Sequence, residues 1–214
     1  MNISTKGIPK KGLPSGFLYV DDVIEDCIVD AKYSGTDNFL GRPVDGYNAP
    51  LIVVTKEAAQ RLVKAAAVLR NKGYVIKLFD SYRPQRAVDD FVRWGENIED
   101  CRRKPLHYPN EEKTDMFVKG YIAEKSGHTR GCAVDLTIVD IHTHQELDMG
   151  SIFDFMDIRS HHGASGLTAL QENNRAILRD AMLANGFRLY KEEWWHYIVD
   201  PEPYPDTYFN FSIE

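Results

Sequence analysis

The stretch SGHTRGCAVD places His128 seven residues before Asp135, with Gly131 between them. This spacing fits either a surface pair at the start of an ordinary strand or two ligands of a metal ion. The sequence CAVDLTIVD is rich in β-branched residues and predicts a strand over 132–140. Glycine allows the chain to bend so that the imidazole can return toward this strand. A metal site would need a third ligand from elsewhere in the chain.

A second group of polar residues lies near the C-terminus, in the sequence EWWHY. Glu193 and His196 would point to opposite faces of a regular strand, so a shared site requires a bulge or turn between them. Without such a bulge or turn, His196 would be a histidine with its hydrogen bonds satisfied in a tryptophan-rich core strand. With it, we expect Trp194 and Trp195 to pack around the site and keep water out.

Two imidazoles and a carboxylate, from His128, His196 and Asp135, form a three-ligand set that suits zinc with a fourth position open. Calcium and magnesium would prefer more oxygen ligands. Zinc in such a site lowers the pKa of its water to about 7, which makes that water a nucleophile at neutral pH. Glu193, three residues from a ligand, is placed to act as the base for this water.

The oxyanion formed by such an attack needs a positive partner, and Arg83 in DSYRP is the candidate. A loop after the strand predicted over 74–80 can aim its side chain at a pocket. Judged alone, Arg83 fits better as the partner of Asp80 in a salt bridge or as a cation on a helix side. The other histidines, none of which we expect to bind zinc, are His107, His142, His144, His161 and His162.

Periodicity predicts the elements that must position these residues. Helices are predicted over 56–72, from Pro84 through Trp94, over 111–125 and over 171–186. Strands are predicted over 74–80, 132–140, 187–191 and 195–200. In the strand over 132–140, alternation puts Ala133, Asp135 and Thr137 on one face, which is a plausible pocket wall. The mixed order lacks a regular βαβ rhythm and favours an α+β fold with a mainly antiparallel central sheet flanked by helices.

The chain has 214 residues, 43% of them hydrophobic and 27% charged, so it is globular and does not span a membrane. We expect one domain over 17–214, with the zinc site in a small closed cavity, behind a flexible arm over 1–16. The net charge of −6, with Lys and Arg scattered along the chain, argues against nucleic acid as a partner. Oligomeric state cannot be read from these features.

Cysteine use and the N-terminus both bear on the cellular compartment. The three cysteines Cys27, Cys101 and Cys132 are widely spaced and odd in number, which argues against a disulfide framework and fits a reducing compartment. Cys132 is expected in the core. The first 22 residues contain no apolar run long enough for a signal peptide, so we expect a cytoplasmic protein. A leader removed from the sequence would instead indicate the periplasm.

Together these residues resemble the zinc D-alanyl-D-alanine dipeptidases of the VanX type. These belong to a wider family with D,D-carboxypeptidases, lysostaphin-type peptidases and the hedgehog signalling domain. The wider pattern, S-x-H-x-x-G-x-A-x-D followed by E-x-x-H, is matched from Ser126 to Asp135 and from Glu193 to His196. The dipeptidase group is also similar in DAKYSGTDNFLGRPVDGY (30–47), DSYRPQRAV (80–88), MGSIFDFMDIRSHH (149–162) and EWWHYIVDPEPYPDTYFNF (193–211).

The resemblance implies a role for each matching residue. One zinc per chain would be held by His128, Asp135 and His196. Glu193 would be the catalytic base and Arg83 would stabilise the transition state. The residues implied to line the small substrate pocket are Tyr33, Ser126 and Asp154. Of these, Asp154 is the acid we expect to bind the ammonium of a dipeptide, because a buried ammonium needs a charged partner.

The activity implied is hydrolysis of D-Ala-D-Ala to two D-alanines, in glycopeptide resistance or in recycling of cell-wall D-alanine. One alternative is a D,D-carboxypeptidase that acts on longer cell-wall peptides. Another is a zinc-binding module without catalysis, as in the hedgehog-like relatives. Glu193 and Arg83 together argue against the module, because a purely structural zinc needs neither a base nor an oxyanion partner. A metal-free α+β domain is the remaining alternative.

Overall fold

The computed structural model describes residue 5 and residues 7–214. Short 3-10 turns, labelled η, accompany the helices and strands. In chain order the elements are β1 (Phe17–Tyr19), η1 (Val20–Asp22), β2 (Ile28–Val29), η2 (Lys32–Ser34), β3 (Val53–Thr55), α1 (Lys56–Arg70), β4 (Tyr74–Asp80), α2 (Gln85–Glu96), α3 (Lys104–His107), α4 (Lys113–Met116), η3 (His128–Arg130), β5 (Ala133–Asp140), η4 (Ile158–Ser160), α5 (Ala169–Ala184), β6 (Phe187–Tyr190) and β7 (Glu193–Val199).

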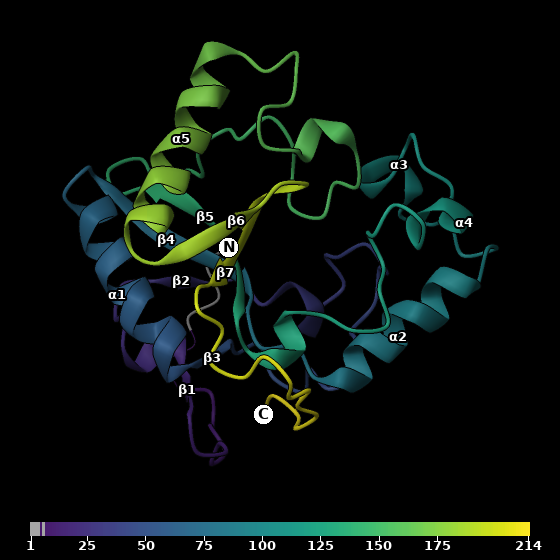
Figure 1. Ribbon diagram of the computed structural model, residues 1–214, viewed down its shortest axis with the longest axis horizontal. Helices are drawn as coiled ribbons and strands as arrows, with labels where there is room; N and C mark the ends of the chain where they lie inside the picture. Colours follow the sequence, from purple (N-terminus) through teal and green to yellow (C-terminus); the bar gives the residue numbers. More distant parts are fainter. Residues whose placement is uncertain (1–4, 6) are drawn as a thin grey trace.

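A five-stranded sheet in the order β2-β4-β5-β7-β6 forms the centre of the fold (Figure 1). The pairs β4–β5, β5–β7 and β6–β7 are antiparallel, and only the short edge strand β2 runs parallel to its neighbour. A second, two-stranded sheet pairs β1 with β3. The predicted α+β fold with a mainly antiparallel central sheet is therefore confirmed.

The helices flank this sheet on two sides. Helices α1 and α5 pack against each other and against the sheet, whereas α2, α3 and α4 lie on the opposite side of the molecule (Figure 1). Each long helix of the first pair begins at a threonine cap: Thr55 Oγ1 accepts from Ala58 N, and Thr168 forms a capping box with Gln171. Such caps satisfy backbone donors that a helix start leaves free. The predicted helices over 56–72 and 171–186 are confirmed to within two residues at each end.

The helix predicted over 111–125 is wrong, because only Lys113–Met116 is helical there. The chain turns back at Gly120, which has a φ of 78°, and the amide of Tyr121 donates to Met116 O at 2.9 Å. Glycine adopts this left-handed conformation without steric cost, so it ends the helix early. The residues that follow are thereby free to run along the edge of a cavity described below.

The predicted flexible arm over 1–16 lies partly outside the described residues, which lack 1–4 and 6. In the described part, Lys10 Nζ pairs with Asp21 at 2.8 Å and Leu13 packs against the core. The freedom of this arm and a domain boundary at residue 17 stay predictions.

Two further expectations concern the membrane and the thiols. Among the residues that the structure describes, no helix has the length and apolar character needed to cross a bilayer. All three cysteines are free thiols. Cys132 is fully buried in the core, as predicted, whereas Cys101 is exposed. The structure thus contains free thiols at very different depths, and the buried one, Cys132, donates to Gly127 O at 3.1 Å.

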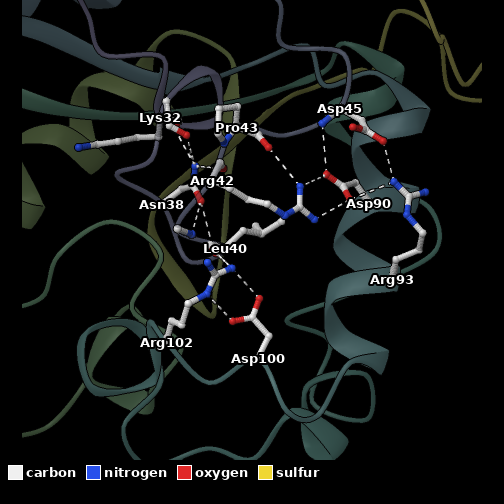
Figure 2. Close-up of polar contacts among 12 residues, drawn as sticks. Lys32, Asn38, Leu40, Arg42, Pro43, Asp45, Asp90, Arg93, Asp100 and Arg102 are labelled. Carbon is white, nitrogen blue, oxygen red and sulfur yellow. Dashed lines mark hydrogen bonds and ion pairs between the residues drawn. The ribbon is translucent and has the colours of Figure 1, made fainter.

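The segment that follows Tyr33 is fastened to α2 by charged groups (Figure 2). Arg42 forms a two-point ion pair with Asp90, with Nη1–Oδ2 at 2.7 Å and Nη2–Oδ1 at 2.8 Å. The Nδ2 amide of Asn38 lies within hydrogen-bond distance of the backbone carbonyls of Lys32, Gly35 and Arg42, at 2.9 to 3.1 Å. A bidentate pair of this kind is directional and holds geometry well. The segment therefore presents Tyr33 and Phe39 to the interior in a fixed position.

His107, at the end of α3, is only 4% exposed, and burial lowers its pKa from 6.5 to about 4. Between pH 6.5 and about pH 4, the unfolded chain therefore binds more protons than the folded one. Lowering the pH through this range lowers the stability of the fold. From pH 7 to pH 5 the loss due to this histidine is about 2 kcal/mol. His107→Asn removes this titrating group. Between pH 7 and pH 5, the free energy of unfolding, measured with urea, should therefore fall by about 2 kcal/mol less in the variant than in the unchanged protein. Equal losses in both proteins would contradict the assignment.

Candidate active site

Neighbouring strands bring the three predicted metal ligands together. Asp135 on β5 is the register partner of His196 on β7. His128 lies in the 3-10 turn η3 that leads into β5, and Gly131 follows this turn with a φ of 68°. A Cβ added to Gly131 would lie 2.7 Å from Thr55 Cγ2, so both conformation and space require glycine here. The tight turn returns the imidazole of His128 to the strand, as the sequence predicts.

The donor atoms of this trio converge. His128 Nε2 lies 3.2 Å from Asp135 Oδ2 and 3.1 Å from His196 Nδ1, and His196 Nδ1 lies 2.9 Å from Asp135 Oδ1. A tetrahedral ion with bonds of 2.0 to 2.2 Å needs ligand atoms about 3.3 to 3.6 Å apart, a few tenths of an ångström more than these separations. Among the described residues, these three form the His, Cys, Asp or Glu group that could hold a metal ion. Their arrangement therefore fits a single bound metal ion.

The other nitrogen of His128 supports this fit. Its Nδ1 lies 2.7 Å from Ser81 O, a carbonyl that can only accept, so Nδ1 carries the proton and Nε2 offers a lone pair. Burial tends to raise the pKa of Asp135, but the two imidazoles outweigh it and hold this pKa below its usual range. Asp135 Oδ1 is buried without a hydrogen bond, as expected of an oxygen that faces a metal ion.

Glu193 lies next to the trio because β7 is irregular where the bulge was expected. Leu189 of β6 pairs with Tyr197, yet the next residue, Tyr190, pairs with Glu193, so residues 194–196 have no partner on β6. This distortion brings Glu193 Oε2 to 3.5 Å from His196 Nδ1. Burial raises the pKa of the Glu193 carboxyl from 4.5 to about 7. A carboxyl with such a pKa can both take and return a proton near neutral pH.

Arg83 combines the two alternatives that the sequence left open. Its Nε and Nη2 each lie 2.9 Å from Asp80 Oδ2, and Nη2 also lies 3.7 Å from Asp135 Oδ2. Tyr47 donates to the other oxygen of Asp80 at 2.7 Å, so this buried carboxylate is anchored in turn. The guanidinium further lies over the ring of Tyr33, 5.0 Å from its centroid. The salt bridge therefore holds Arg83 beside the metal ligands.

A cavity of about 260 Å³ is lined by all eight residues predicted for the site. Within it, Tyr33 donates to Asp154 Oδ2 at 2.8 Å, and Ser126 Oγ accepts from His128 N at 3.2 Å. Burial raises the pKa of the Asp154 carboxyl well above its usual value. A cation that enters the cavity would stabilise the ionised form of this acid. A cavity of this volume can hold a small molecule.

Part of the cavity lining has no signal in the sequence. Phe39 and Phe91 come from the segment before α1 and from α2, and no polar motif marks them. Asp80, which holds Arg83 beside the site, lies in the same DSYRP stretch, and this proximity could have indicated its role. The expectation for Trp194 is wrong: only Trp195 lines this cavity, whereas Trp194 lines a second one and donates to Ser151 Oγ at 2.9 Å. Adjacent residues of a strand point to opposite faces, so the two indoles lie on different sides of the sheet.

A segment near the C-terminus braces the two loops that carry Arg83 and His128. The amide of Phe209 donates to Thr129 O at 3.0 Å, and the carbonyl of Phe209 accepts from Gln85 N at 3.0 Å. One residue thus bridges the two loops through its backbone. The ring of Phe209 packs edge-on against Phe17, with 4.9 Å between the centroids.

A two-histidine, one-carboxylate set beside a buried acid and an arginine, on this α+β fold, defines a metal-dependent hydrolase. Comparison with known proteins agrees with this class. The sequence model of the D-Ala-D-Ala dipeptidase family, peptidase M15, matches residues 14–214. The chain belongs to this family, whose members are metallopeptidases.

Individual relatives match over nearly the whole chain. A D-alanyl-D-alanine dipeptidase of Enterococcus faecium is 46% identical over 199 residues, which cover 93% of this chain and 98% of the relative. One from Streptomyces coelicolor is 47% identical over 197 residues, or 92% of this chain and 98% of the relative. A more distant one, from Escherichia coli, is 30% identical over 175 residues, which cover 82% of this chain and 80% of the relative.

Proposed function

We propose that this metallopeptidase hydrolyses the dipeptide D-Ala-D-Ala to two D-alanines. The observation that carries the proposal is the cavity of about 260 Å³, in which the metal-ligand trio, Glu193, Arg83 and Asp154 meet. Its size suits a dipeptide. The near full-length similarity to curated D-alanyl-D-alanine dipeptidases supports the same substrate.

We further propose that the ion is zinc, held by His128 Nε2, His196 Nδ1 and a carboxylate oxygen of Asp135. Two nitrogens and one oxygen are too few oxygen ligands for calcium or magnesium. Zinc, when bound, supplies a Lewis acid that polarises the scissile carbonyl and lowers the pKa of water to about 7. The hydrogen bond from His128 Nδ1 to Ser81 O keeps the ligand nitrogen deprotonated and in place.

The residues of the chain then handle protons and charge. Glu193 accepts a proton from the attacking water and returns it to the amine of the leaving D-alanine, so no net proton stays on the enzyme. Arg83 donates to the oxygen that becomes negative as the carbonyl carbon turns tetrahedral. Its pairing with Asp80 limits its motion, and this preorganisation makes the donor effective. The product amine and the new carboxylate leave as two D-alanines.

The ends of the dipeptide need partners of their own, because burial desolvates both charges. We assign the ammonium to Asp154, whose position is fixed by the donated hydrogen bond of Tyr33. The ammonium would also lower the raised pKa of this carboxyl and keep it ionised. Ser126, at the cavity edge beside His128, would hydrogen-bond one end of the substrate.

Purified protein tests this function directly. With D-Ala-D-Ala as substrate, D-alanine should be released, activity should disappear with a zinc chelator, and added Zn²⁺ should restore it. L-Ala-L-Ala is a matched control of equal size and charge. Undiminished hydrolysis in the metal-free protein, or no hydrolysis of D-Ala-D-Ala by the zinc-loaded protein, would refute the proposal.

The assignment of Asp154 predicts a preference for a free amino end. Acetylation of the substrate amine removes a charged hydrogen bond that is worth about 1.5 to 3 kcal/mol. Therefore kcat/KM for N-acetyl-D-Ala-D-Ala should be about one to two decades lower than for D-Ala-D-Ala. Asp154→Ala should reduce this preference. Equal kcat/KM values for the two substrates in the unchanged protein would favour a D,D-carboxypeptidase instead.

A further inference from the structure

The chain passes from one cavity to another at Asp154. Phe153 lines a second cavity and stacks on Phe79, with 4.6 Å between the ring centroids. Its neighbours Asp154 and Phe155 line the catalytic cavity. This change of side coincides with a φ of 57° at Asp154, in the left-handed region that non-glycine residues rarely adopt. Such a conformation persists only where surrounding contacts hold it.

Two hydrogen bonds tie this backbone to His107. Its ring Nδ1 lies 3.1 Å from Asp154 O, and its own carbonyl accepts from Met156 N at 2.8 Å. One residue of α3 therefore binds the chain at Asp154 and again two residues later. His107 lines the second cavity and is absent from the lining of the catalytic one, so it acts on the site only through this backbone.

Its neighbours determine the tautomer of His107. Asp154 O can only accept, so Nδ1 carries a proton. Nε2 lies 3.3 Å from Arg103 Nη2, a group that can only donate, so Nε2 accepts. The ring is thus neutral, in accord with the lowering of its pKa to about 4 by burial. Arg103 is itself held by Asp37 at 3.2 Å, and this pair fixes the imidazole from behind.

We propose that His107 is a positioning residue for substrate recognition: it clamps the left-handed backbone at Asp154 and thereby aims the carboxylate at the substrate ammonium. The inference rests on the proposed function, since it needs Asp154 to bind that ammonium. It gives a role to a histidine that has no contact with the substrate cavity. The donor at Nδ1 is the essential feature, because the carbonyl of residue 107 remains whatever its side chain.

The test compares His107→Asn with His107→Gln. The amide nitrogen of asparagine lies where Nδ1 does, whereas that of glutamine lies near Nε2, so only asparagine can donate to Asp154 O. For D-Ala-D-Ala, His107→Gln should raise KM about tenfold with little change in kcat, the pattern of lost substrate binding. For N-acetyl-D-Ala-D-Ala, which lacks the ammonium, kcat/KM should not change. The preference for the free dipeptide should therefore shrink about tenfold, and His107→Asn should retain it.

His162→Gln is the matched control. His162 is half-buried, and burial lowers its pKa to about 4. It lines neither the catalytic cavity nor the second one. Its replacement should leave the preference unchanged. The inference is overturned if His107→Gln keeps the full preference, if it slows both substrates equally, or if His107→Asn behaves like His107→Gln.

The same measurements separate this inference from the proposed function. If the unchanged protein hydrolyses both dipeptides equally well, the assignment of Asp154 to the ammonium fails, and the clamp fails with it. If the unchanged protein prefers the free dipeptide and all three variants keep that preference, only the role of His107 fails. Zinc content, measured for each variant, should stay at one ion per chain, because His107 lies outside the ligand trio.

Discussion

Protein carrying Glu193→Gln should retain its bound zinc and lose turnover of D-Ala-D-Ala by a factor of about 10² to 10⁴, the usual contribution of general acid–base catalysis. Glutamine has nearly the same shape but can neither take nor return the proton. Glu193 Oε2 lies 3.5 Å from His196 Nδ1, close enough to the trio to reach a water there. The loss should appear in kcat, since the proton transfer belongs to the chemical step.

The neighbouring acid Glu192 provides the control for this variant. It precedes Glu193 in the sequence but does not line the catalytic cavity. Glu192→Gln should therefore keep both zinc and turnover. Near-normal turnover in Glu193→Gln would place the base elsewhere, and loss of zinc in that variant would instead make Glu193 a ligand.

Asp135→Ala should release the metal ion. The substitution leaves two imidazoles, and their shared partner on β5 is gone. Loss of a residue that merely orients a ligand costs about 10- to 100-fold in metal affinity, so loss of a ligand should cost more. Zinc per chain, measured after dialysis, should fall from one to a small fraction, and hydrolysis should fall with it.

Asp140, at the other end of the same strand, is the matched control for Asp135. Its carboxylate accepts from the amides of His142 and Thr143 in the turn that follows β5, far along the strand from the trio. Asp140→Ala should keep a full complement of zinc. Full zinc occupancy in Asp135→Ala, with activity intact, would exclude this residue from the metal site.

Much of the fold could be predicted because long elements have periodic patterns. The strands over 74–80 and 132–140 and the helix after Pro84 are where the sequence places them. The strands β1, β2 and β3 have only two or three residues each, too few for a period, and their partners lie far along the chain. The helix over 111–125 failed because the local apolar pattern outweighed one glycine, Gly120, whose conformation ends the helix.

The convergence of His128, Asp135 and His196 could be predicted because residue type and spacing both limit a metal site. The bulge before His196 could be predicted for the same reason, since a shared site required it. The position of His107 could not: its contact with Asp154 is through a backbone carbonyl, which carries no residue-specific signal. The sequence also left open whether Arg83 pairs with Asp80 or faces the cavity, and in the folded protein it does both.

The backbone bridge at Phe209 connects the turn that contains His128 to the start of α2, two residues after Arg83, from a segment outside the cavity. Its amide and carbonyl form these two bonds, so the bridge itself depends on the conformation of the backbone, whereas the ring of Phe209 packs on Phe17. Selection for altered activity could therefore act on chain length and conformation here rather than on residue identity. In directed evolution, insertions, deletions and prolines around this position would be a route to changed rates that libraries confined to pocket residues never sample.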